Sequence, residues 1–303
     1  MADDTAYEGL FGGDSSQWAF GTDFEDPLAG VDTTMVDDVV ADDLALYCLG
    51  LADDALIMSQ RLSEWCSRAP EMEDDVALAN LALDLLGQAR LLLARAAAAS
   101  PSVVPVLPEG SPVPPEDALA FFRSADQFRN VRLVEVPGGD FAHIIVRLLL
   151  FSVARRELLE RLRGSRDQVI SAVAARGVKE VSYHRDWSAR WFVVLARGTT
   201  RSRRRLIAAL DELWPYQAEL VKCGAVDLSM ADAGVGVDPS AYAGAVDAVL
   251  DQVLAASGVE RPSRGPLAGV DGRFGRDGVH TEALSLMLAE MQVVARAHPR
   301  GRW

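Results

Sequence analysis

DDLALYCLGLADDALIMSQRLSEWC (42–66) is followed across Pro70 by EMEDDVALANLALDLLGQARLLLARAAAA (71–99). In the first segment, apolar residues recur at alternating spacings of four and three, which places them on one face of a helix. These stripe residues are Leu44, Cys48, Leu51, Ala55, Met58, Leu62 and Trp65. Because Pro70 ends the first helix, the two segments predict a helical hairpin.

The second segment begins with acidic residues, which favour a helix N-terminus. Apolar residues then occupy nearly every side, so we expect a central, buried helix up to Ala99. One polar strip interrupts the apolar surface: Asn80, Asp84, Gln88 and Arg95.

Further helices are predicted along the rest of the chain. A Pro-rich loop (100–117) precedes a short helix (117–128), and Asp140 is placed to cap the next helix. Longer helices are expected at 141–163, 167–196, 201–222, 240–256 and 281–297. The long link after the second helix predicts an all-α, ferritin-like four-helix bundle with additional C-terminal helices.

Charge is distributed unevenly along the 303 residues, whose net charge is −14. Residues 1–60 hold 14 acidic residues and no Lys or Arg, and the rest holds 30 of each sign. Residues 1–38 are therefore predicted to be an acidic, disordered extension, and 39–303 one helical domain. No basic stripe suggests nucleic acid. No apolar run reaches the roughly 18–20 residues that span a bilayer.

The cysteines Cys48, Cys66 and Cys223 are odd in number and scattered. They are typical of reduced thiols in a cytoplasmic protein. No signal peptide is expected.

A ferritin-like bundle often holds a di-iron centre, with a lone Glu on two helices and Glu-x-x-His on the other two. The first helix offers Asp54, whereas Asp53 is expected to point away. The second offers Asp84, but Gly87 stands where the motif requires His. These two helices therefore supply shortened acids and no imidazole.

The third helix has no carboxylate between Asp140 and Glu157, and Arg147 places a fixed positive charge there. The fourth offers Glu180 and His184, spaced four apart instead of three. We therefore expect no di-iron site, no catalytic residue and no bound cofactor in this chain. The positions of the predicted vestigial site are Asp54, Asp84, Gly87, Arg147, Glu180 and His184.

Two interpretations of these positions remain open. Asp54, Asp84, Glu180 and His184 could hold a single metal, or the carboxylates could pair with His184, Arg147 or Arg95 in a buried polar network. Other polar residues are interpreted as structural or solvated: His143, His280, His298 and the basic run 201–205. No nucleotide-binding loop or nucleophilic triad is visible.

Several runs together resemble a known family. They are MSQRLSEWCSRAPEMEDDVALANLALDLLGQAR (58–90), ADQFRNVRLVEVPGGDFA (125–142), VKEVSYHRDWSARW (178–191), LWPYQAELV (213–221) and VHTEALSLMLAEMQ (279–292). The resemblance, from about residue 42 to Trp303, is to the C subunits of bacterial phenylacetyl-CoA epoxidases. The acidic extension and the Pro-rich insert (101–115) depart from the family pattern.

This resemblance implies a structural subunit that packs against a homologous catalytic di-iron subunit. A reductase subunit would supply electrons for epoxidation of the phenylacetyl-CoA ring. Two alternatives remain: a metal-binding oxygenase in its own right, or a subunit that contributes to phenylacetyl-CoA binding. The apolar first helix and the last helix, with Met287 and Met291, are candidate partner surfaces.

Overall fold

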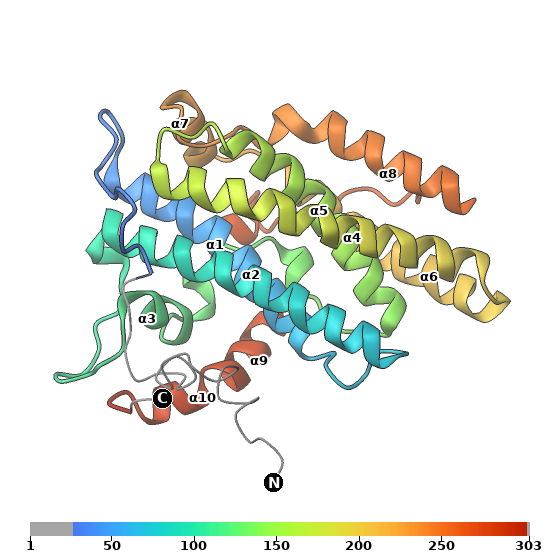
Figure 1. Ribbon diagram of the computed structural model, residues 1–303, viewed down its shortest axis with the longest axis horizontal. Coiled ribbons are helices and arrows are strands. Elements are labelled where there is room, and N and C mark those ends of the chain that lie inside the picture. The colour runs from blue at the N-terminus through green and yellow to red at the C-terminus, as the bar shows by residue number, and fades with distance from the viewer. Residues whose placement is uncertain (1–26, 302–303) are drawn as a thin grey trace, which may run out of the picture.

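Long helices lie side by side in the structure, a computed structural model that describes residues 27–301 (Figure 1). The bundle consists of α1 (Ala41–Ser63), α2 (Met72–Ala99), α4 (Phe141–Leu162) and α5 (Gln168–Arg197). Helix α1 pairs with α2, α4 pairs with α5, and α2 also packs against α5. Between residues 27 and 301 the only β-type pairing is an isolated bridge. The predicted all-α fold is confirmed.

Helix α1 turns its predicted apolar stripe into the core. Every stripe residue is buried, including Trp65 just beyond the helix end. The helix ends at Ser63 instead of Cys66, and Ser67 adopts a left-handed backbone with φ of 69°. Each buried aliphatic side chain contributes about 1.5–3 kcal/mol of transfer free energy, so this stripe anchors α1.

Helix α2 is only partly buried, and the prediction of a central helix is wrong. Its outward face carries three large apolar side chains that are more than half exposed: Met72, Val76 and Leu83. The apolar sequence on all sides of α2 could not show which sides other elements cover. By length and composition α2 could also cross a membrane, contrary to expectation, but half of its apolar window is buried inside the bundle, as in a core helix.

The link between α2 and α4 runs from one end of the bundle to the other. Ser100, just after α2, bonds Asp42 at the start of α1, whereas Phe141 at the start of α4 packs against Trp65, just beyond the end of α1. The link contains short helices: η3 (Pro101–Val103), α3 (Pro115–Phe121), η4 (Ala125–Gln127) and η5 (Arg132–Val134). The predicted helix at 117–128 thus starts earlier and ends at Phe121. Asp140 caps α4 as predicted, because its Oδ1 accepts hydrogen bonds from the backbone N–H groups of Ala142 (3.0 Å) and His143 (3.3 Å).

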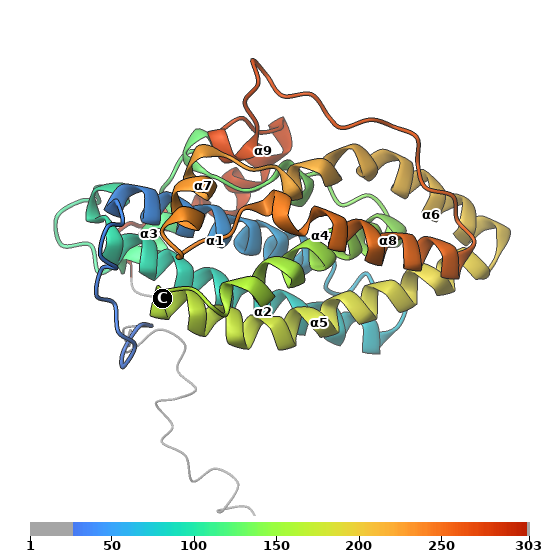
Figure 2. The ribbon, with the colours of Figure 1, turned by 90° about the horizontal axis from the view of Figure 1, so that it is seen from above.

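C-terminal elements pack beside the bundle (Figure 2). They are α6 (Thr200–Leu213), η6 (Trp214–Val221), α7 (Ala225–Asp232), η7 (Pro239–Tyr242), α8 (Ala243–Ser257), η8 (Gly275–Asp277), α9 (Glu282–Met291) and α10 (Val293–Ala297). Helix α7 contacts α1, and α6 and α8 each contact both α4 and α5. The helix predicted at 201–222 changes to 3-10 geometry at Trp214, because Pro215 cannot donate a backbone hydrogen bond. Helix α7 was not predicted.

The described structure begins at Pro27, so most of the predicted extension (1–38) lies outside the described residues. Residues 27–38 pack against the bundle rather than extending away from it. Leu28 is buried, and the carbonyl of Thr33 accepts a hydrogen bond from Arg95 Nη1 at 3.0 Å. The boundary predicted at residue 38 is therefore too late.

Polar pairs run along the contact between α2 and α5, here called the α2–α5 seam. The pairs are Asp74–Trp191 (3.0 Å), Asp84–His184 (3.0 Å), Gln88–Glu180 (3.1 Å) and Arg95–Asp167 (2.8 Å). Gly177 permits the close approach of the helices, because an added Cβ would lie 3.0 Å from Leu159 Cδ1 and 3.1 Å from Gln88 Nε2. The seam therefore fixes both the register and the spacing of the two helices.

We expect Gly177→Leu to lower the free energy of unfolding by about 1–3 kcal/mol, because the new side chain overpacks the seam. Gly87→Leu is the matched control: a Cβ at Gly87 meets nothing within 4 Å. There the exchange should raise stability by about 0.5–1 kcal/mol through helix propensity. Urea unfolding of both variants tests this pair, and equal effects would contradict it.

Candidate functional site

The interior of the bundle is the place where four helices could each offer a metal ligand. Asp84 and Gly87 do not occupy inward positions: the Asp84 side chain is 33% exposed, and Gly87 is exposed. One residue later on α2, Leu85 and Gln88 are buried at the required spacing of three. The prediction that Asp84 and Gly87 face the bundle interior is therefore wrong, because the inward positions of α2 lie one residue later.

On α5, as on α2, an aliphatic residue stands where the di-iron motif has Glu. Val181 and His184 are spaced three apart and both fully buried, whereas Glu180 lies at the edge of the seam. Each inward pair thus has an aliphatic residue at the place of the motif's Glu. Of these side chains only His184 is an effective metal ligand.

His184 contacts Asp84, and the predicted pairing of these two residues is present in the structure. His184 Nε2 lies 3.0 Å from Asp84 Oδ2. The other ring nitrogen, Nδ1, is buried and has no hydrogen-bond partner among the described residues. The His184 imidazole therefore contributes one of the polar contacts that hold α2 against α5.

Arg155 on α4 occupies the middle of the bundle and was not singled out from the sequence. Its Nη1 donates to the carbonyl of Leu51 on α1 (3.1 Å), and its Nη2 donates to Gln88 Oε1 on α2 (3.2 Å). Gln88 Nε2 in turn donates to Glu180 Oε2 on α5 (3.1 Å). This four-helix chain (Leu51, Arg155, Gln88 and Glu180) connects all four bundle helices.

Burial lowers the pKa of Arg155, and the negative charge of Asp54 partly opposes this effect. An Arg guanidinium keeps its proton in proteins, because its ordinary pKa lies far above neutral. A permanent cation in the middle of the bundle repels a metal cation. It also occupies the space between α1, α2 and α4.

Asp54 is buried as predicted, but both of its carboxylate oxygens have partners. Oδ1 accepts hydrogen bonds from the backbone N–H of Val131 (2.8 Å) and from Arg276 Nη1 (3.0 Å). Oδ2 accepts from Arg276 Nη2 at 2.6 Å. Burial alone would lower the pKa of Arg276, but the Asp54 carboxylate outweighs it and raises the pKa above its ordinary value. Asp54 therefore holds Arg276 instead of a metal.

Arg147 is buried but does not pair with these carboxylates, so that predicted interaction is wrong. Its Nη2 donates to the carbonyl of Pro137 (2.7 Å), while Nε and Nη1 have no partner among the described residues. Burial, and then the neighbouring Arg61, lowers the pKa of Arg147 to about 10. Arg147 thus supports the loop before α4, and Arg155 is the cation of the bundle centre.

Asp53 does point away from the bundle centre, yet it is fully buried. It pairs with Arg123, and its Oδ2 accepts a hydrogen bond from the backbone N–H of Arg129 at 2.8 Å. Nearby, Glu135 accepts hydrogen bonds from the backbone N–H of Thr281 (2.6 Å) and the amide of Asn130 (3.2 Å).

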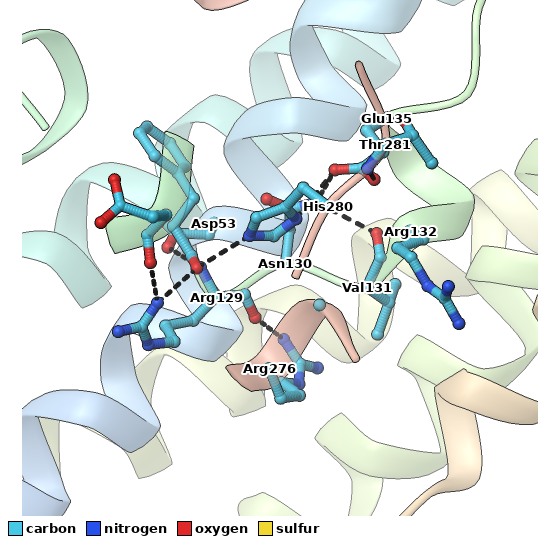
Figure 3. Close-up of polar contacts among 12 residues, drawn as sticks. Asp53, Arg129, Asn130, Val131, Arg132, Glu135, Arg276, His280 and Thr281 are labelled. Carbon is cyan, nitrogen blue, oxygen red and sulfur yellow. Dashed lines mark hydrogen bonds and ion pairs between the residues drawn. The ribbon is translucent and has the colours of Figure 1, made fainter. Parts of the chain in front are cut away.

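Figure 3 shows how these contacts hold the loop 129–135 between α1 and the C-terminal segment. His280 Nδ1 lies 2.9 Å from Glu135 Oε2, and its Nε2 lies 2.9 Å from the carbonyl of Phe128. His280 is therefore structural, as expected. The sequence analysis missed Arg123, Glu135 and Arg276, although the first two lie in or beside the run 125–142 that carries part of the family resemblance.

The donor groups present do not fit a di-iron centre. Leu85 and Val181 stand where the di-iron motif has Glu, and Arg155 places a fixed positive charge in the bundle centre. Both carboxylate oxygens of Asp54 already accept hydrogen bonds, from Arg276 and Val131. Nowhere in residues 27–301 do three or more His, Cys, Asp or Glu side chains gather in a geometry suited to a metal. The proposed mononuclear set does not assemble either: among its members only Asp84 and His184 touch, since Asp54 pairs with Arg276 and Glu180 with Arg176 at 2.6 Å.

The chain is similar to proteins of one known family. The sequence profile described as phenylacetic acid catabolic protein matches residues 29–303. The chain is 39% identical over 260 residues to the C subunit of the 1,2-phenylacetyl-CoA epoxidase of Escherichia coli (strain K12). That alignment covers 86% of this chain and 99% of the relative.

We expect Arg276→Met to lower the free energy of unfolding by about 3–5 kcal/mol, because Asp54 is left as an uncompensated buried charge. The double variant Arg276→Met/Asp54→Asn should recover part of the loss, since no unpaired charge remains. Denaturant unfolding measures both effects as a double-mutant cycle.

Arg163→Met serves as the control for this cycle. Its ion pair with Glu160 is exposed on both sides (54% and 39%), so its loss should cost less than about 1 kcal/mol. If Arg276→Met were no more destabilising than this control, the assignment of Asp54 to Arg276 would be wrong.

Proposed function

Because the chain belongs to the phenylacetic acid catabolic protein family, we propose that it is the non-catalytic, structural subunit of a phenylacetyl-CoA ring epoxidase. In this role it packs against a homologous catalytic subunit that carries the di-iron centre, and a reductase subunit supplies electrons. The chain itself contributes no cofactor. The complex acts in the cytoplasm in phenylacetate degradation.

The observation that carries this proposal is the four-helix chain through Arg155. In a catalytic bundle of this type, four helices meet at a pair of metal ions. Here the corresponding meeting point is a hydrogen-bonded Arg–Gln pair that ends on a carbonyl of α1 and a carboxylate of α5. The arrangement links the helices without a metal, as a rigid supporting subunit requires.

The outer face of α2 is the surface that best fits a partner bundle. The candidate surfaces expected from the sequence are largely used inside the chain: the α1 stripe and Met287 are buried, and Met291 is partly buried against the core. Met72, Val76 and Leu83 instead are more than half exposed on α2, and α2 lies on the side of the bundle away from α7 and α9 (Figure 2). An apolar helix face of this kind suits an obligate interface, which typically buries more than about 2,000 Å².

We predict less than about one iron per ten chains in the purified chain, and stoichiometric iron only after co-purification with the homologous subunit. Metal analysis by inductively coupled plasma mass spectrometry measures both preparations. A chelator should leave the melting temperature of the isolated chain unchanged, because no metal contributes to its stability. Two irons per isolated chain would refute a non-catalytic role.

We predict that Leu83→Glu weakens binding of the catalytic subunit by at least about 2 kcal/mol, because a charge would be buried at the interface. Leu228→Glu is the matched control: Leu228 is 50% exposed on α7, against 62% for Leu83 on α2. Both variants should fold with unchanged circular dichroism. Co-purification and sedimentation velocity measure binding, and equal binding by both variants would exclude α2 as the interface.

A further inference from the structure

Aromatic rings gather where the loop after α1, the start of α4 and the second half of α5 meet. The centroid of the Phe141 ring lies 6.1 Å from that of Trp65 and 5.0 Å from that of Trp191. The Trp187 centroid lies 6.5 Å from that of Phe141 and 6.4 Å from that of Trp191. These are the distances of aromatic rings in contact. The four residues, here called the indole cluster, therefore form a continuous path of rings.

The indole cluster connects two separate parts of the molecule. Trp191 is partly buried at the α2–α5 seam, and its Nε1 donates a hydrogen bond to Asp74 Oδ1 at 3.0 Å. Asp74 belongs to the first turn of α2, which also carries the exposed Met72. At the other end of the path, Trp65 directly precedes the exposed Cys66. The path thus runs from the α2–α5 face to the loop that follows α1.

The bond between Trp191 and Asp74 suits the loss of one electron from the indole. An oxidised indole is a cation, and its N–H group becomes acidic. A carboxylate oxygen 3.0 Å from Nε1 is within reach of that proton. Burial raises the pKa of Asp74 against the opposing effect of the Trp191 hydrogen bond, and the charges of Glu71, Glu73 and Asp75 add to the rise. This carboxylate is therefore a stronger proton acceptor than an ordinary Asp.

Trp214 has the opposite surroundings. The guanidinium of Arg261 lies over its ring, with Cζ 5.1 Å from the ring centroid. A cation in this position is attracted to the neutral ring and repels an oxidised, positively charged ring. Trp191 and Trp214 are therefore a matched pair of indoles, one beside a proton acceptor and one beside a fixed positive charge.

We propose that the indole cluster is a one-electron relay, in which Trp191 gives an electron to an oxidant at the α2–α5 face and its Nε1 proton to Asp74. The oxidant is reduced by one electron, and the protein then holds a neutral indolyl radical and a protonated Asp74. An electron from Trp65 passes through the ring contacts of Phe141 and refills Trp191, while Asp74 returns the proton. A soluble thiol at the loop after α1 reduces Trp65 and releases its own proton, and two oxidised thiols combine to a disulfide.

This inference rests on the proposed function only for the natural source of the oxidant. A partner that activates oxygen releases one-electron oxidants when it turns over without substrate, and the proposed interface lies on α2, the helix that carries Asp74. The relay moves such oxidising equivalents away from the interface to thiols. The electron transfer itself belongs to residues of this chain and is measurable without the partner.

Light-driven oxidation of the full chain tests the relay. A ruthenium polypyridyl photosensitiser is attached to Cys66 after Cys223→Ser, because Cys48 is buried. Trp18→Phe and Trp303→Phe are included in every protein, so that all remaining indoles lie at described positions. A laser flash with a soluble ruthenium(III) quencher oxidises the label beside Trp65. We expect transient absorption to show a neutral indolyl radical, formed after the oxidising equivalent has reached Trp191.

Three substitutions locate this radical. Trp191→Phe should reduce the yield of the neutral radical several-fold, whereas the matched Trp214→Phe should leave it unchanged. Asp74→Asn keeps the indole but removes the proton acceptor, so the radical cation should persist several-fold longer before it loses its proton to water. Phe141→Leu should slow the arrival at Trp191 several-fold, because the intervening ring is lost.

Other results overturn the relay. Equal yields from Trp191→Phe and Trp214→Phe, an unchanged lifetime of the radical cation in Asp74→Asn, or a tyrosyl radical as the sole product would each contradict it. Circular dichroism checks the fold of every variant, and the near-isosteric Asp74→Asn decides the matter if Trp191→Phe unfolds. Because the isolated chain is used, the result is independent of the iron content and partner binding that test the proposed function.

Discussion

A permanent positive charge inside an apolar bundle needs partners on several sides, and the placement of Arg155 follows from this constraint. Its guanidinium can be buried only because Leu51, Gln88 and the nearby Asp54 lie on neighbouring helices at the correct height. This requirement fixes the register of α1, α2 and α4 together. Glu180 extends the same network to α5. The spacing of the four helices is thus set by hydrogen bonds where a catalytic bundle would use metal ions.

The α2–α5 seam and the C-terminal layer complete this arrangement from opposite sides. Along the seam, polar pairs at four levels prevent the two helices from sliding, and Gly177 lets them approach closely. On the other side, η8 brings Arg276 to Asp54 on α1. The covered side and the apolar outer face of α2 give the molecule two different surfaces. Under the proposed function, the second bundle binds to the outer face of α2.

Much of this fold could be predicted from local sequence. The spacing of the α1 stripe, the cap at Asp140 and the density of prolines after α2 each act through neighbouring residues, and each prediction agrees with the structure in kind. The inward face of α2 could not be predicted, because its apolar residues surround the helix. Arg155, Arg123 and Arg276 were missed because their partners come from remote segments. The break at Pro215 could have been anticipated from its fixed backbone angle and missing donor.

The ion pair between Asp54 and Arg276 also bears on how the chain is synthesised. The two residues are separated by 222 positions, so the pair cannot form until residue 276 has left the ribosome. Until then Asp54 must remain hydrated or be held by Val131 alone, and α1 cannot settle fully into the bundle. Contacts of such long sequence separation slow folding and prolong exposure of apolar helices. A nascent chain of this protein therefore keeps apolar helix surfaces exposed to other molecules until residue 276 has been synthesised.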